Sequence, residues 1–398
     1  MNHFKYNNKN FITIILINIL VLTSLSMVHP VTPKLINSVG LPTFYFGLLY
    51  GCLNISTFVA SPTFGSICDL YGKKFPMMLG MLGYTIGQVI FGFFPNHVTV
   101  LIARIISGIF ISGYYVSSIS YVSYITPNSQ KLKRFAYLNA SGSLGIAIGS
   151  LLGGYLGTND YRVTFIVQII LSLISLLCIA IFFKDISIKN KEAKFTIKIF
   201  SIKDFKKVSK SNKFIFLILS LMILTFLGIQ SYTSTISYYV EDILKLPTTV
   251  NGLILGSTGM FTLITNLFII PIANKKFSSK TLYLSSTLIS GLSIVISMTS
   301  TNKIILTTFL LIFIIAHTLI APIMQSMIIE NSKNNKGELL GLQNGFKAIG
   351  SFLGAISSGI IFDLWFKLPF LISGFSLILC FIILVLYENL YNKQSYNQ

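Results

Sequence analysis

The stretch GSICDLYGKKF, residues 65–75, lies between two long apolar segments and carries one aspartate, two lysines and two glycines. Charged residues are costly inside a bilayer but are tolerated where a chain turns at the membrane surface. Apolar segments on both sides of such a turn predict two membrane-spanning helices joined by a short loop. The rest of the sequence repeats this arrangement.

The composition is that of an integral membrane protein. Of 398 residues, 53% are hydrophobic and only 10% are charged, whereas soluble domains carry roughly 25% charged residues. A spanning helix needs about 20 apolar residues. We expect the run from Phe11 to be a retained first span, because HPVTPKL after it offers no small-residue cleavage site. About twelve such spans are predicted, at 11–35, 43–67, 76–94, 98–125, 135–157, 162–183, 213–238, 250–273, 280–299, 304–329, 339–363 and 368–388.

A basic stretch divides these spans into two sets of six. We predict an N-terminal six-helix bundle at 1–183, a cytoplasmic basic linker at 184–212 and a C-terminal six-helix bundle at 213–398. An offset of 205 residues relates the fifth span to the eleventh, which indicates a duplication and an all-α polytopic fold with two pseudo-symmetric halves. The matching pairs are Asn139 and Asn344, Gly145 and Gly350, Gly149 and Gly354, Gly154 and Gly359, and Arg162 and Lys367.

The distribution of basic residues predicts the orientation. Of the 30 lysines and arginines, most fall on the side of the central linker and both termini, which is therefore expected to be cytoplasmic. This bias accounts for the net charge of +19, and it predicts contact with anionic lipids rather than with nucleic acid.

Neither cofactor binding nor enzymatic chemistry is predicted. No phosphate-cradling glycine loop, metal-ligand spacing or nucleophile signature occurs, so direct ATP driving is not expected. The four cysteines fall in or beside apolar runs and indicate no disulfide framework.

The loop between spans two and three is predicted to act as a conformational latch. Gly65 and Gly72 are expected to allow close helix approach and a tight turn, while Lys73 and Lys74 face the cytoplasm and anionic lipid. We expect the Asp69 carboxylate to contact the positive N-terminus of the eleventh span.

Charged and polar residues inside the spans are the candidates for the substrate and proton pathway. Buried cations occur without buried acids, because all eleven acidic residues lie in loops or at span ends. This imbalance favours an anionic substrate near Arg104 and Lys347; for Lys347 the alternative is a side chain that reaches back to the surface. The candidates are His29, Arg104, Asn139, Tyr232, His317, Gln325, Asn344 and Lys347.

The fifth span carries glycines four residues apart, at Gly145, Gly149 and Gly153, followed by Gly154. Small residues at this spacing let helices touch backbone to backbone. The contact is expected either to seal the outer face against a helix of the other half, or to be ordinary membrane packing.

Four stretches resemble motifs of one family. GSICDLYGKKF resembles the loop-2/3 signature of the major facilitator superfamily, and LIARIISGIF (101–110) resembles the fourth-span motif of its drug/proton antiporter branch. GIAIGSLLGG (145–154) resembles the antiporter motif, except that Ser150 replaces the usual proline, and ITPNSQKLKRFAYL (125–138) resembles Gram-positive multidrug pumps. The resemblance implies a monomeric, proton-driven secondary exporter of the bacterial cytoplasmic membrane, working by alternating access.

The substrate class stays open between two alternatives. The resemblance favours amphipathic drugs, whereas the charge distribution favours an anionic endogenous metabolite such as a siderophore or an opine-type metallophore. An importer of a small organic anion is a third alternative, and a membrane receptor or lipid-handling protein is the alternative that involves no transport. Proton coupling would depend on His29, His317, Asp69 or the substrate itself.

Overall fold

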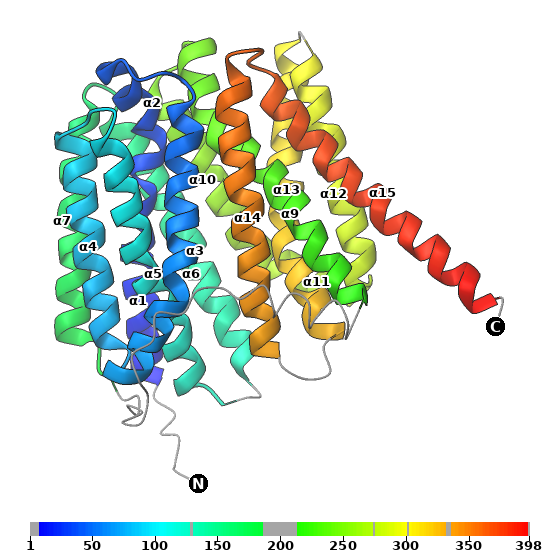
Figure 1. The fold of residues 1–398 in the computed structure, drawn as a ribbon, viewed down its shortest axis with the longest axis horizontal. Coiled ribbons are helices and arrows are strands. Elements are labelled where there is room, and N and C mark those ends of the chain that lie inside the picture. Colours follow the sequence, from blue (N-terminus) through cyan, green and yellow to red (C-terminus); the bar gives the residue numbers. More distant parts are fainter. Residues whose placement is uncertain are drawn as a thin grey trace. The chain divides into compact units, whose positions relative to one another are not determined.

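The computed structural model describes residues 8–127, 130–185, 213–273, 275–300, 302–331 and 336–396. Within those ranges every regular element is a helix (Figure 1). The helices are α1 (Asn8–Ser26), α2 (Val28–Val39), α3 (Tyr45–Tyr71), α4 (Lys74–Phe93), α5 (Thr99–Ile125), α6 (Lys131–Leu156), α7 (Tyr161–Phe182), α9 (Lys213–Tyr238), η2 (Tyr239–Ile243), α10 (Thr248–Ile264), η3 (Thr265–Ile269), α11 (Ile270–Ala273), α12 (Ser279–Thr299), α13 (Lys303–Asn331), α14 (Lys336–Phe362) and α15 (Leu368–Tyr396).

The predicted all-helical membrane architecture is confirmed. In the described part of the chain, eleven helical stretches are long and apolar enough to cross a membrane. The remaining predicted span, 43–67, corresponds to the 27-residue helix α3. The first predicted span is one continuous crossing, Asn8–Val39, although its helix is interrupted at Met27 between α1 and α2.

The chain forms two compact units, and the predicted division into two six-helix bundles stays a prediction. Unit 1 comprises Met1–Phe200 with Ile236–Leu267, and unit 2 comprises Ser201–Thr235 with Phe268–Gln398. Helix α10 therefore joins the N-terminal spans, although it lies in the predicted C-terminal bundle. The predicted linker lies outside the described residues from position 186 onwards.

A polar network joins three helices in the interior of unit 1. The Tyr114 hydroxyl donates to Asn18 Oδ1 over 2.9 Å. The Asn18 amide in turn donates to the Leu138 carbonyl and to Ser141 Oγ, over 3.0 and 2.8 Å. Apolar side chains from α1, α4, α5, α6 and α7 surround this network. Because lipid cannot satisfy polar groups, the network fixes α1, α5 and α6 together.

The duplicated glycines make equivalent contacts in the two units. In unit 1, a Cβ added at Gly145 would lie 2.7 Å from the Ile19 carbonyl oxygen, and one at Gly149 would lie 2.1 Å from that of Thr23. In unit 2, the corresponding distances are 2.4 Å from Gly350 to Ile223 and 2.3 Å from Gly354 to Leu227. Helix α6 thus packs on α1 as α14 packs on α9. The glycines repeat at the predicted offset of 205 residues, and the residues that they face repeat at an offset one residue shorter.

Candidate functional site

The loop 65–75 is built around the first turn of α4. Gly72 has a φ of +85°, a backbone region that L side chains rarely adopt. The backbone N–H groups of Lys73 and Lys74 donate to Asp185 Oδ2 over 2.6 and 2.9 Å. A carboxylate at a helix N-terminus satisfies otherwise unpaired N–H groups and complements the helix dipole. Asp185 therefore ties the end of α7 to the start of α4.

Lys73 does not face lipid as expected, whereas Lys74 is half-buried and its position facing the cytoplasm stays a prediction. Lys73 is buried, and its ammonium donates to the Cys68 carbonyl over 3.0 Å. The Lys74 ammonium donates to the Ala180 carbonyl over 2.6 Å. These carbonyls end α3 and α7, where cations are stabilised by the negative end of the helix dipole. Both lysines fasten helix ends inside unit 1.

The other two latch residues behave differently from the lysines. The Asp69 side chain is 64% exposed, and its Oδ1 lies 3.7 Å from the Lys73 ammonium. Its predicted contact with the eleventh span stays a prediction. Gly65 makes no close approach to another described helix, because no heavy atom outside its own turn of α3 lies within 4 Å of the place its Cβ would take.

Arg104 is buried in unit 1 without an acidic partner among the described residues. It lies on α5 with 3% of its surface exposed, and its guanidinium carbon is 4.0 Å from the centre of the Phe91 ring. Arg104 Nε has no hydrogen-bond partner within the described ranges. Four further side chains are within electrostatic range of the guanidinium: His29, Tyr50, Cys52 and Tyr84.

His29 takes part in this environment through a ring contact. It stacks on Tyr50 with the ring centroids 5.2 Å apart. Neither His29 Nδ1 nor the Tyr50 hydroxyl has a hydrogen-bond partner in the described part of the chain. The structure therefore brings together two of the predicted site residues, His29 and Arg104.

Sequence reasoning missed four polar residues of unit 1: Tyr50, Tyr84, Gln88 and Gln168. Gln168 Nε2 donates to the Tyr84 hydroxyl over 2.7 Å, and Gln88 Nε2 donates to Ser107 Oγ over 3.1 Å. The Oε1 atoms of both glutamines lack a partner among the described residues. Glutamine inside an apolar span is a signal that was available, because such a residue is costly unless it has a role.

In unit 2, Lys347 and Asn344 lie on an open face of α14, because both side chains are exposed although they lie well inside the helix. The Lys347 ammonium is 5.0 Å from the centre of the Phe226 ring, and no carboxylate lies within ion-pair distance of it among the described residues. Ser351 and Ser358, predicted to share this face, are buried. The polar face of α14 is therefore exposed near Asn344 and Lys347 and buried near Ser358. The Ser358 and Ser234 hydroxyls are hydrogen-bonded over 2.7 Å.

His317 and Tyr232 form a second aromatic cluster in unit 2. His317 stacks on Phe313 with the centroids 4.8 Å apart, and Tyr232 lies 4.6 Å from Phe313 and 5.9 Å from His317. His317 Nδ1 lies 3.0 Å from the Phe313 carbonyl oxygen, which is the hydrogen bond of a structural histidine. The Tyr232 hydroxyl is buried without a hydrogen-bond partner in the described residues.

The remaining pathway candidates form no side-chain hydrogen bond with another candidate in the described part of the chain. Asn139 on α6 is exposed, as is its counterpart Asn344 on α14, and Gln325 on α13 is half-buried. Within the described residues, the structure does not bring Gln325 together with the other candidates through a hydrogen bond.

The glycines of α6 divide between two partners. Gly145, Gly149 and Gly153 face the backbone of Ile19, Thr23 and Met27, so ordinary packing within the N-terminal spans describes these three. By contrast, a Cβ added at Gly154 would lie 2.6 Å from the Gly252 Cα of α10. Gly154 and Gly252 thus make one close contact between α6 and α10, and Gly256 and Gly259 of α10 also lie against the α6 residues Ala147 and Leu151. These contacts explain why α10 belongs to unit 1.

Comparisons with known proteins agree with this architecture. The family model described as Major Facilitator Superfamily matches residues 14–275 and 218–397. The quinolone resistance protein NorA of Staphylococcus aureus (strain N315) is 23% identical over 372 residues, which cover 92% of this chain and 93% of NorA. Multidrug resistance protein 2 of Bacillus subtilis (strain 168) is 25% identical over 383 residues, which cover 93% of each chain.

Solved structures show the same fold. The human organic anion transporter MFSD10 (TETRAN) aligns with a TM-score of 0.72 and 16% identity, covering 95% of this chain and 99% of that one. A D-xylose-proton symporter aligns with a TM-score of 0.74 and 14% identity, covering 95% and 97%.

Proposed function

This chain belongs to the Major Facilitator Superfamily, and we propose that it is a proton-driven exporter of small amphipathic organic molecules. It is a membrane transporter with multidrug efflux pumps among its relatives. The proposed mechanism is alternating access, with membrane-embedded side chains as the substrate-binding groups. Both termini are proposed to lie in the cytoplasm of a bacterium, and the protein to act as a monomer.

One observation carries the proposal: each unit holds a membrane-embedded cation against an aromatic ring, with no acidic partner among the described residues. These are Arg104 on Phe91 and Lys347 on Phe226. An uncompensated cation inside a membrane favours a negative guest, and aromatic rings favour a flat apolar one. The preferred substrate is therefore an aromatic or amphipathic molecule that carries a carboxylate or similar group.

A second candidate substrate is an anionic metabolite, such as a siderophore or an opine-type metallophore. It is favoured by the exposure of Lys347 and Asn344 on one face of α14, because a carboxylate-rich molecule gains most from an accessible ammonium and amide.

For proton coupling, we propose His29. It lies within electrostatic range of Arg104, and a bound anion would offset the repulsion between the guanidinium and a protonated imidazole. Protonation and substrate binding would then be linked at one site. We also propose that Asp69 acts in the latch between the halves, with Lys73 holding it in place over 3.7 Å.

Transport by everted membrane vesicles tests the proposal. The vesicles are energised by an imposed proton gradient, and uptake is compared for an aromatic carboxylate drug, a lipophilic cationic dye and a carboxylate-rich chelator. Wild type is compared with Lys347→Ala and with Lys276→Ala, a control on an exposed loop lysine of unit 2.

Gradient-dependent uptake of the aromatic carboxylate, weakened in Lys347→Ala and kept in Lys276→Ala, supports the amphipathic-anion proposal. Uptake of the chelator alone favours the metabolite. Dye uptake that does not change with Lys347→Ala would contradict an anionic substrate. Accumulation of the anion by right-side-out vesicles would instead identify an importer, and the absence of any gradient-dependent flux would favour a receptor or lipid-handling role.

A further inference from the structure

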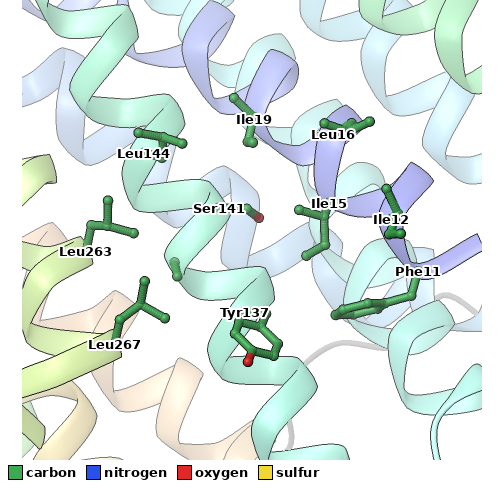
Figure 2. A pocket seen from close by; sticks show the side chains of 11 residues that line it. Phe11, Ile12, Ile15, Leu16, Ile19, Tyr137, Ser141, Leu144, Leu263 and Leu267 are labelled. Atoms are coloured by element: carbon green, nitrogen blue, oxygen red, sulfur yellow. The ribbon is translucent and has the colours of Figure 1, made fainter. Parts of the chain in front are cut away.

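Unit 1 carries an apolar groove on the surface of α6, between α1 and the α10–η3 segment. Figure 2 shows Ile15 and Leu16 of α1 on one wall and Leu263 and Leu267 on the other, with Leu144 of α6 at the base. The cavity measures about 310 Å³. The exposed fraction of Leu16 is 57%, so this wall continues onto a surface that faces lipid.

Among the described residues that line the groove, the side-chain polar groups are the hydroxyls of Ser141 and Tyr137. The hydroxyl of Ser141 lies in the base of the groove, but it donates to the Leu138 carbonyl over 2.7 Å and accepts from the Asn18 amide over 2.8 Å. The other hydroxyl of the lining belongs to Tyr137, which lies at one end beside Phe11, with the ring centroids 6.5 Å apart. A hydrocarbon chain satisfies such walls, whereas a polar drug would lose its hydrogen bonds to water without replacement.

Positive charge gathers at the end of the groove marked by Phe11 and Tyr137. The Lys133 ammonium lies 5.9 Å from the Tyr137 ring centre, and the Arg134 guanidinium carbon lies 4.3 Å from that of Phe11. Arg134 Nη2 also donates to Asn8 Oδ1 over 3.0 Å, which holds the starts of α1 and α6 together. Lys9 and Lys133 are exposed at this end.

We propose that this groove is a binding site for an anionic phospholipid of the inner leaflet, distinct from the transport site. One acyl chain lies along Leu144 between α1 and α10, and the phosphate headgroup is held by Lys133. Headgroups meet a membrane protein at the level where a spanning helix begins, which is where Lys133 stands. Charge at one end and hydrocarbon along the rest is the pattern of a lipid rather than of a compact solute.

Quenching of a tryptophan placed in the groove tests the site. The sequence has one tryptophan, Trp365, and Trp365→Phe removes its fluorescence. In this background, Leu144→Trp places a single tryptophan in the groove, and Leu173→Trp on α7 is the control. Leu173 is 42% exposed on another face of unit 1. Each protein is reconstituted in phosphatidylcholine bilayers that contain phosphatidylglycerol, with brominated acyl chains on one lipid or the other and no gradient imposed.

Brominated phosphatidylglycerol is expected to quench Leu144→Trp at a mole fraction about five-fold lower than brominated phosphatidylcholine, because each lysine near an anionic headgroup contributes roughly that factor. Leu173→Trp is expected to show no preference. Adding Lys133→Gln should remove most of the preference, whereas Lys276→Gln should leave it intact.

Equal quenching by the two lipids, or none by either, overturns the proposal. Loss of the preference in Lys276→Gln as well would assign it to general surface charge and overturn the site. If Leu144→Trp is not monodisperse after purification, Leu263→Trp reports from the opposite wall. Because no transport is measured, failure of the lipid site is distinguishable from failure of the export proposal.

Discussion

The α1–α6 pair of unit 1 and the α9–α14 pair of unit 2 share two glycine contacts, at Gly145 and Gly149 and at Gly350 and Gly354, but differ beside them. Gly142 of α6 faces Leu22 of α1, with 3.7 Å between the place of its Cβ and Leu22 Cγ. At the position 205 residues later, Lys347 of α14 lies over the Phe226 ring. The two glycine contacts are equivalent in the two pairs. The helix face beside these contacts carries a cation in α14, at Lys347, but not in α6, at Gly142.

This difference separates two requirements on a duplicated helix: close backbone contact with its partner helix, and the side chains that it presents beside that contact. Backbone contact through Gly149 or Gly354 leaves no room for a Cβ, so both copies need glycine. Position 142 or 347 lies beside the contact and tolerates either no side chain or a long one. The substrate-binding properties of a half can therefore change without disturbing its packing.

The largest effect should come from adding a methyl group at the contact. Gly149→Ala and Gly354→Ala would place a Cβ 2.1 and 2.3 Å from a backbone oxygen, so each is expected to destabilise its pair by about 1–3 kcal/mol. Gly142→Ala is the control, because its Cβ would lie 3.4 Å from the nearest atom. Thermal unfolding of the detergent-purified proteins measures the difference. If Gly149→Ala unfolded at the temperature of Gly142→Ala, close backbone contact would not be what holds α6 against α1.

Removing the buried cation of unit 1 should stop transport without unfolding the protein. Arg104→Ala eliminates the guanidinium that lies 4.0 Å from Phe91 and is expected to abolish gradient-driven uptake of every substrate. Arg162→Ala, at an exposed arginine, is the matched control. Vesicle uptake, normalised to protein in the membrane, measures the effect, and full activity of Arg104→Ala would remove this residue from the pathway.

A smaller and selective effect is expected at Lys347. Lys347→Ala should raise the half-saturating concentration of anionic substrates about ten-fold, which corresponds to losing one charge-assisted contact. Transport of a neutral substrate should persist, and Lys347→Arg should restore much of the loss. A uniform loss for neutral and anionic substrates would indicate a packing role against Phe226 instead.

The smallest effect concerns two helix N-termini, one in each unit. Asp185 accepts from the first N–H groups of α4, whereas Ser278 Oγ accepts from the Thr281 N–H at the start of α12 over 3.2 Å. Asp185→Asn and Ser278→Ala are each expected to cost about 0.5–1 kcal/mol. The stability loss of Asp185→Asn should shrink in high salt, because the charge is screened, and that of Ser278→Ala should not. Unfolding temperatures at two salt concentrations test this contrast.

The sequence by itself determined the number and approximate limits of the spans, the glycine register and the identity of the membrane-embedded cations. Hydrophobic length and small-residue spacing are local properties, so they can be read without knowing what a helix touches. The repeat of Gly145 and Gly149 at Gly350 and Gly354 even predicted equivalent contacts, which the structure contains.

Only the tertiary structure decided the partners. Lys73 and Lys74 look like surface cations, but they bind carbonyls at the ends of α3 and α7. Asp185, which lies more than 100 residues away, caps α4, and α10 joins unit 1 through Gly154 and Gly252. Such pairings depend on which helix ends meet in space, and a one-dimensional pattern of charge and hydrophobicity does not contain that information.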